Sequence, residues 1–151
     1  MKIRKMDPED FDNVKNVIQN TLFDIYGSDK IKWEDFSKYD IVFVAEEENM
    51  IVGCVAIKNV DDDWAKLKRM YILPDFQKRG IGNELLDKCI EYCRNSNFSR
   101  IILTTYLEME GAVKFYKGKG FEIVDNPTDK YFTNSKLKEY NAKQIVMRRE
   151  L

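Results

Sequence analysis

A glycine-containing turn between a strand-like run and an amphipathic helix constrains this chain more than any other segment. The turn reads Gln77-Lys78-Arg79-Gly80-Ile81-Gly82. It follows the strand-like segment of residues 65–73 and precedes residues 81–94, where apolar side chains recur at helical spacing. The start of a helix leaves backbone N–H groups unpaired, and a tight turn from a strand points them in one direction. The pattern therefore predicts an anion-binding turn.

The anion that suits this turn best is a pyrophosphate. The helix dipole places roughly half a positive charge at the helix start, and glycine lets a phosphate approach the backbone without a Cβ in the way. Lys78 and Arg79 add two cationic side chains. Four or more converging donors exceed what one carboxylate can accept, so the turn predicts a nucleotide-like ligand. A turn that only starts a helix is the structural alternative.

Two other phosphate-binding motifs do not fit this sequence. A dinucleotide fingerprint requires a third glycine where Leu85 stands. A Walker loop requires Ser or Thr after Gly-Lys, whereas Gly118-Lys119 is followed by Gly120. Neither motif explains the turn.

The composition predicts one globular domain over residues 1–151, because 44% of the residues are apolar and 34% are charged. Lys plus Arg number 25 and Asp plus Glu 26, so no net field attracts a nucleic acid or an anionic membrane. The chain has no histidine and no Cys-x-x-Cys, which removes the usual parts of a zinc site or a Ser-His or Cys-His nucleophile. We therefore expect no metal, no nucleic-acid partner and no membrane partner.

The N-terminal residues, the lengths of the apolar runs and the cysteines indicate the cellular compartment of the protein. Residues 1–5 are too short and too charged to begin a secretory signal, and no apolar run is long enough to cross a bilayer. We therefore expect a cytoplasmic protein. The 3 cysteines cannot all pair, and Cys89 and Cys93 share one face of a predicted helix, so we expect reduced core thiols.

Strand-like and helix-like patterns alternate in an order typical of a mixed α/β fold. The predicted strands are residues 1–5, 41–45, 51–59, 65–73, 101–105, 121–124 and 144–149. The predicted helices are one from Phe11 that Asp7 caps and Gly27 ends, a short one over 31–38, and two over 81–94 and 111–117. Hairpin order among several strands favours one mixed sheet flanked by helices. The acidic runs 46–49 and 61–63 are interpreted as solvated turns.

Two motifs at the right separation resemble the GNAT superfamily of acyl-CoA-dependent N-acetyltransferases. The turn resembles the family signature Gln/Arg-x-x-Gly-x-Gly/Ala, and residues 70–74 before it resemble the strand that ends in aromatic-Val-x-Pro. Residues 111–121 resemble the second signature, Ala-x-x-(aromatic or Leu)-Tyr-x-x-x-Gly-Phe. The similarity covers residues 41–124 well. It implies a GNAT-like fold with a single mixed sheet of about six or seven strands flanked by about four helices.

Carried over position by position, the resemblance implies a site for acetyl-CoA. The cofactor-binding positions on the turn are Gln77, Lys78, Arg79, Gly80, Ile81 and Gly82, whose backbone N–H groups from Lys78 onward would hold the pyrophosphate. The pantetheine arm would bond the backbone of Met70, Tyr71 and Ile72 like an added strand edge. Phe115 would pack near this arm, and Tyr116 would approach the thioester sulfur.

The chemistry implied is direct attack of an amine on the thioester. Such a reaction needs a deprotonated nitrogen, a polarised carbonyl and a proton for the leaving thiolate. The backbone N–H at Ile72, or one position away, could polarise the acetyl oxygen, and Tyr116 could supply the proton as general acid. Core packing of the Tyr116 ring is the alternative interpretation of that residue.

The general base stays open. Many relatives carry a glutamate on the strand before the glycine turn, whereas residues 66–69 here are Lys-Leu-Lys-Arg. Candidates that could act through water are Asp61, Asp62, Asp63, Glu108 and Glu110, and loss of the proton to solvent before binding is a further route. Relatives often have an asparagine where this chain has Met109, which puts one polar coenzyme contact in doubt.

We expect a small-molecule or peptide amine as the acceptor, and a homodimer is compatible with the sequence. Aromatic residues that could line an acceptor pocket are Tyr26, Trp33, Tyr131, Phe132 and Tyr140. Acidic residues near them would suit a cationic amine. One rival function is a non-catalytic acyl-CoA-binding sensor or interaction module, and another is a nucleotide-binding protein unrelated to CoA.

Overall fold

The computed structural model describes residues 1–26, 36–107, 109–124 and 144–151, and seven strands of this part form one sheet in the order β1-β2-β3-β4-β5-β7-β6. The strands are β1 (Lys2–Lys5), β2 (Ile41–Glu47), β3 (Met50–Asp61), β4 (Trp64–Ile72), β5 (Arg100–Tyr106), β6 (Glu122–Ile123) and β7 (Gln144–Glu150). The α-helices are α1 (Phe11–Tyr26), α2 (Ile81–Asn95) and α3 (Glu110–Gly118), and the short 3-10 helices are η1 (Pro8–Asp10), η2 (Phe36–Lys38) and η3 (Pro74–Phe76).

The predicted mixed sheet with flanking helices is confirmed. β4 and β5 are parallel, and the other neighbouring strands of the sheet are antiparallel. β6 is shorter than predicted, with two residues in place of four. The helix predicted over 31–38 is described only from residue 36, as η2, while Gly27, residues 31–35 and residues 125–143 lie outside the described residues.

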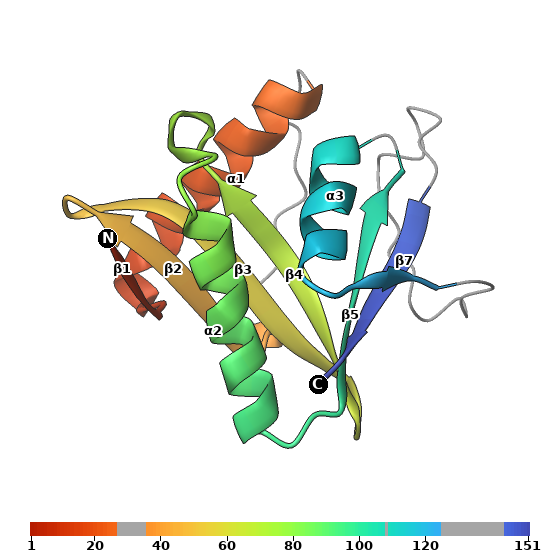
Figure 1. Ribbon diagram of the computed structural model, residues 1–151. Helices are drawn as coiled ribbons and strands as arrows, with labels where there is room; N and C mark the ends of the chain where they lie inside the picture. The colour runs from red at the N-terminus through yellow and green to blue at the C-terminus, as the bar shows by residue number, and fades with distance from the viewer. Residues whose placement is uncertain (27–35, 108, 125–143) are drawn as a thin grey trace.

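Helices cover both faces of the sheet, and Figure 1 shows α2 and α3 in front of it with α1 behind. Leu85, Leu86 and Cys89 of α2 pack with Val113 and Tyr116 of α3 in the larger core. Buried apolar side chains of α1 pack instead with β2 and β3 on the opposite face. We call these two surfaces the α2 face and the α1 face. Cys54, Cys89 and Cys93 are buried and free, as predicted.

The two acidic runs lie at hairpin tips. Glu48 and Asn49 join β2 to β3 with φ angles of 51° and 64°, which is the backbone of a two-residue turn that matches strand twist. Asp62 and Asp63 join β3 to β4 and are exposed. The described residues contain no group of His, Cys, Asp and Glu side chains that could hold a metal ion.

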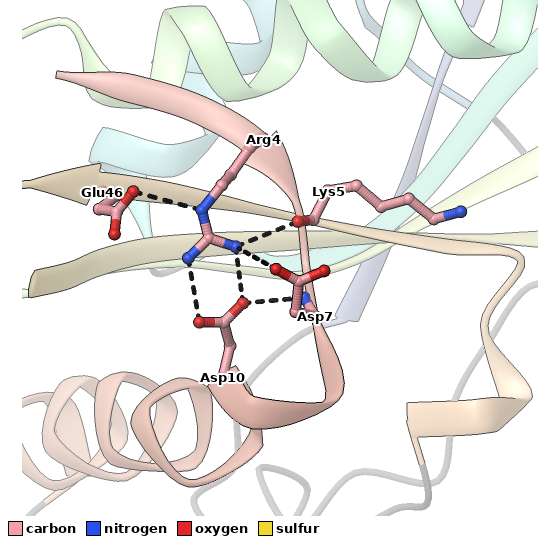
Figure 2. Close-up of polar contacts among 5 residues, drawn as sticks. All are labelled: Arg4, Lys5, Asp7, Asp10 and Glu46. Atoms are coloured by element: carbon pink, nitrogen blue, oxygen red, sulfur yellow. Dashed lines mark hydrogen bonds and ion pairs between the residues drawn. The ribbon is translucent and has the colours of Figure 1, made fainter. Parts of the chain in front are cut away.

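An ion cluster fixes the first strand to the start of α1, as Figure 2 shows. The guanidinium of Arg4 donates to both carboxylate oxygens of Asp10, at 2.7 and 3.0 Å, and its Nε donates to Glu46 on β2 at 3.2 Å. Asp7 was predicted to cap the helix, and its own backbone N–H donates to Asp10 Oδ2 at 2.8 Å. Because Arg4 holds the Asp10 carboxylate, the pKa of that carboxyl lies below its ordinary value of 3.8.

The feature that positions the candidate site is a fork between β4 and β5. The parallel pairing joins only Trp64 to Arg100, Ala65 to Ile101 and Lys66 to Ile102. Beyond these pairs the two strands diverge toward the end of the sheet where α2 begins, with α3 beside the opening (Figure 1). The rest of β4 therefore has a backbone edge that β5 does not pair.

Candidate functional site

The glycine turn leaves a row of backbone N–H groups available. Gly80 has a φ of 85° and directly precedes α2, and Lys78 has a φ of 62°. The first hydrogen bond of the helix runs from the Glu84 N–H to the Gly80 carbonyl, at 3.2 Å. Within the described ranges, no backbone carbonyl accepts from the N–H groups of residues 78–83. These amides and the helix dipole make the turn suitable for an anion.

The two glycines of the turn have different surroundings. A Cβ at Gly80 would meet no atom within 4 Å, whereas a Cβ at Gly82 would lie 3.3 Å from Ile72 Cδ1 and 3.5 Å from Phe115 Cζ. Gly80 therefore faces open space, where a ligand can approach the backbone. Gly82 allows close packing of the turn against the end of β4 and against α3. The predicted residues Ile72, Gly82 and Phe115 are thus brought together.

Two side chains of the turn make contacts within the protein. Gln77 Nε2 donates to the Ile72 carbonyl at 2.9 Å, which ties the turn to the last residue of β4. The Arg79 guanidinium lies 5.0 Å from the centre of the Phe76 ring, a cation–π distance. Lys78 and Arg79 are both exposed. The backbone of the turn is therefore held in place while two cationic side chains face solvent.

A bulge in β4 reorients the strand before the turn. The pairing with β3 is irregular between Cys54 and Ala56, and opposite it Arg69 adopts a φ of 57°. A bulge bends its strand and increases the local twist, which accounts for the divergence of β4 from β5. Past the bulge, Met70 and Ile72 pack on the α2 face and Tyr71 packs on the α1 face. The sequence contained no turn residue that signalled this bulge.

Tyr116 lies in the core of the α2 face, beside the fork. Its side chain is 7% exposed, and its ring centre is 5.2 Å from that of Phe115 and 5.5 Å from that of Phe121. Burial raises the pKa of the Tyr116 hydroxyl above its ordinary value of 10, with smaller contributions from Cys89 and Tyr71. The hydroxyl therefore keeps its proton at neutral pH, and the ring contributes to packing.

The fold places three of the candidate bases far from the glycine turn. Asp61, Asp62 and Asp63 lie at the β3–β4 hairpin, at the far end of β4 from the glycine turn. Nine residues of strand span about 27 Å, so this hairpin is remote from the turn. Glu110 is exposed at the first residue of α3, and Glu108 lies outside the described residues.

Two residues of the α1 face were not singled out as functional from the sequence. Lys66 is 6% exposed, and burial, followed by the charges of Lys68 and Lys58, lowers its pKa to about 8. Tyr106 is 7% exposed, and its hydroxyl is buried without a hydrogen-bond partner in the described part of the chain. The alternation of side chains along a strand is the sequence signal that could have assigned Lys66 and Tyr106 to this face.

The proposed acceptor pocket cannot be placed from the aromatic residues. Trp33, Tyr131, Phe132 and Tyr140 lie outside the described residues, as does the side chain of Tyr26.

No helix among the described residues is long and apolar enough to span a membrane.

Comparisons with known proteins agree with the two motifs. The model of the acetyltransferase (GNAT) family matches residues 6–121. An uncharacterized N-acetyltransferase of Methanocaldococcus jannaschii is 33% identical over 135 residues, a match that covers 80% of this chain and 60% of that protein. This chain thus spans less than two thirds of the length of that relative.

Solved structures show the same fold. A GNAT-family acetyltransferase of Staphylococcus aureus superposes with a TM-score of 0.83 at 21% identity, covering 99% of this chain and 98% of that chain. A GNAT-family acetyltransferase of Elizabethkingia anophelis with acetyl-CoA bound superposes with a TM-score of 0.72 at 19% identity, covering 99% and 97%. With the family model matched across most of the sequence and the fold shared, this chain belongs to the GNAT family of acetyltransferases.

Proposed function

We propose that this chain is an N-acetyltransferase that moves the acetyl group of acetyl-CoA to a primary amine by direct attack on the thioester. The observation that carries the proposal is the continuity of the fork with the glycine turn: β4 loses its β5 partner after Lys66 and leads into the unbonded amides of residues 78–83. An unpaired strand edge suits an extended, amide-containing arm, and the amides suit a pyrophosphate. An acyl-CoA carries both parts in one molecule.

In this proposal the backbone of Met70, Tyr71 and Ile72 bonds the pantetheine arm. The amides of residues 78–82 hold the pyrophosphate, with the Arg79 side chain beside them. Gln77 contributes by holding the end of β4, as its hydrogen bond to the Ile72 carbonyl indicates. Phe115 closes the space between the turn and α3, where it is in contact range of Gly82.

The chemical step forms one bond and breaks one bond. The amine nitrogen bonds the carbonyl carbon, the carbon–sulfur bond breaks, and the nitrogen loses a proton to water. A backbone N–H near Ile72 polarises the carbonyl, an interaction worth on the order of 3 kcal/mol. The thiolate, with a reference pKa of about 8.5, accepts the proton of the Tyr116 hydroxyl. Burial keeps the Tyr116 hydroxyl protonated when the thiolate leaves, but it also makes the hydroxyl a weaker acid, and the tyrosinate then regains a proton from water.

The experiment that tests the proposal combines acetyl-CoA calorimetry with thiol release over a panel of primary amines. We expect acetyl-CoA to bind and at least one amine to release thiol. Tyr116→Phe should lower turnover by roughly ten- to a thousandfold while acetyl-CoA binding is retained, because only the proton donor is removed. Tyr92→Phe, whose ring packs against Phe43 on β2, is the matched control. An unaltered rate in Tyr116→Phe removes that residue from the mechanism.

One specific observation favours a second function, an acyl-CoA-binding sensor without catalysis. β4 carries Lys66, Lys68 and Arg69 where many family members have a glutamate. Binding of acetyl-CoA without thiol release from any amine would favour the sensor. Competition by ATP or NAD, but not by desulfo-CoA, would instead indicate an unrelated nucleotide site. The cytoplasmic location and the homodimer stay predictions.

A further inference from the structure

The bulge in β4 decides which face the end of this strand presents beside the fork. Arg69 and Met70 on β4 stand opposite a single residue of β3, Val55. Leu67 packs on the α2 face, so uninterrupted alternation along β4 would place Met70 and Ile72 on the α1 face, yet both pack on the α2 face. The extra residue therefore sets the side on which the last residues of β4 lie.

Tyr39 holds the bulge from the α1 face. Arg69 Nε donates to the Tyr39 hydroxyl at 3.2 Å, and the Lys68 ammonium lies 5.8 Å from the centre of the Tyr39 ring. Tyr39 is itself buried, and its ring centre is 5.9 Å from that of Phe36, which is 5.3 Å from that of Phe11 on α1. An aromatic cluster outside the sheet thus fixes the hydroxyl that receives the Arg69 side chain.

The Cys54 thiol holds the backbone of the same bulge. Its Sγ donates to the Arg69 carbonyl at 3.3 Å. Burial raises the pKa of the Cys54 thiol to about 12, so the S–H donor is retained at neutral pH. Arg69 has a φ of 57°, a backbone that residues other than glycine adopt only when their surroundings hold them in it. Contacts to its side chain and to its carbonyl provide that support.

The bulge is followed by the backbone groups that face the fork. The Leu73 N–H donates to the Val52 carbonyl on β3 at 2.9 Å, so the N–H and C=O of the preceding residue, Ile72, point to the opposite side of β4. Gln77 Nε2 donates to the Ile72 carbonyl at 2.9 Å. The Ile72 N–H therefore lies on the edge that the proposed function gives to the pantetheine arm and the thioester.

We propose that Tyr39 and Cys54, which we call the bulge clamp, are positioning residues for acetyl transfer: they hold Arg69 in the bulge, and the bulge presents residues 70–72 to the thioester arm of acetyl-CoA. The inference rests on the proposed function. The glycine turn is held by separate contacts, from Gln77 and at Gly82. Loss of the bulge clamp should therefore misplace the thioester arm without weakening the binding of the pyrophosphate.

Binding of two ligands tests the inference without any amine. Calorimetry measures the Kd for acetyl-CoA and for 3′-phospho-ADP, which carries the pyrophosphate but no pantetheine arm. Tyr39→Phe and Cys54→Ala should each raise the Kd for acetyl-CoA about three- to tenfold, since binding must then restore the bulge, and leave that for 3′-phospho-ADP within about twofold. An unchanged Kd for acetyl-CoA in the double variant overturns the inference, and so does an equal rise for both ligands.

Conservative variants separate the clamp from general packing. Tyr92→Phe removes a hydroxyl from a ring on the α2 face and should change neither Kd. Cys54→Ser keeps a donor and should bind acetyl-CoA more tightly than Cys54→Ala. Arg69→Gly should bind it at least about threefold more tightly than Arg69→Ala, because glycine adopts a φ of 57° without strain. Equal Kd values within both of these pairs would show that the bulge backbone does not govern binding, and the inference would be wrong.

Turnover separates this inference from the proposed function. With an amine that the wild type acetylates and with saturating acetyl-CoA, Tyr39→Phe should lower kcat about three- to tenfold and leave the KM for the amine within about twofold, because only the placement of the thioester changes. A kcat equal to that of the wild type in the double variant overturns the inference and leaves the proposed transfer intact. A wild type that binds acetyl-CoA but acetylates no amine counts against the proposed transfer, while the Kd values still decide whether the clamp positions the arm.

Discussion

Replacing Lys66 by methionine should stabilise the protein at neutral pH. The side chain is 6% exposed, and burial, with Lys68 and Lys58, lowers its pKa from 10.5 to about 8. A tenfold change in an equilibrium constant corresponds to about 1.4 kcal/mol, so keeping the buried lysine charged costs up to about 3 kcal/mol. Methionine fills a similar volume without charge, and we expect the free energy of unfolding to rise by about 1 to 3 kcal/mol at pH 7.

The pH dependence of this gain has a definite sign. Below pH 8 the lysine is charged in both the folded and unfolded states, so the full penalty is present. Between pH 8 and 10.5 the unfolded state binds more protons than the folded state, and the stability of the wild type rises with pH. The difference between Lys66→Met and the wild type should therefore shrink across this range and vanish above it.

Urea unfolding at pH 7 and at pH 10.5 measures both quantities. Lys58→Met is the matched control, because Lys58 stands opposite Lys66 in the sheet but is exposed. We expect the control to change stability by no more than about 0.5 kcal/mol. The reasoning is refuted if Lys66→Met is no more stable than the wild type at pH 7, or if its gain is the same at both pH values.

Two further predictions concern the turn and the ion cluster. Gly80→Ala should raise the Kd for acetyl-CoA at least about tenfold in calorimetry and lower stability by about 1 kcal/mol, because a φ of 85° strains alanine and the methyl group occupies the open side of the turn. Gly118→Ala, with no φ in the left-handed region and no atom within 4 Å, should do neither, and equal Kd values for the two variants would contradict the placement of the pyrophosphate. Asp10→Asn should lower the free energy of unfolding by about 1.5 to 3 kcal/mol at pH 7, because it removes the charge that accepts from Arg4. Since the folded pKa of Asp10 is lowered, this stabilisation is present above the ordinary carboxyl pKa of 3.8 and is lost as the pH falls through the folded pKa, so urea midpoints of the two proteins should converge at low pH.

The glycine turn could be predicted because its structure depends on local chemistry. Gly80 adopts a left-handed backbone that other residues avoid, and the helix that follows leaves its first amides unbonded in any surroundings. The amphipathic pattern of residues 81–94 likewise required only helical periodicity, and it matches α2 (Ile81–Asn95) closely. The turn and the second motif at residues 111–121, both local patterns, were sufficient to indicate the family.

For some residues the local pattern predicted the position in a turn or strand but not the contacts or the burial of the side chain. Gln77 was expected at a coenzyme turn, and the fold uses its side chain to bond the Ile72 carbonyl. Lys66 and Lys68 are separated by one residue, which predicts a common face of a strand, yet nothing local shows that the Lys66 side chain is buried. Burial depends on which elements pack against the strand.

The sequence by itself determined the order of the elements, the anion-binding turn and the family, because each follows from residues close together in the chain. Only the tertiary structure decided where β4 and β5 separate, since that depends on strand pairing, on the bulge at Arg69 and on contacts between distant segments. It also decided that Lys66 and the Tyr106 hydroxyl are buried on one face of the fork. Pairing and desolvation are properties of the assembled sheet, and no short window of sequence contains them.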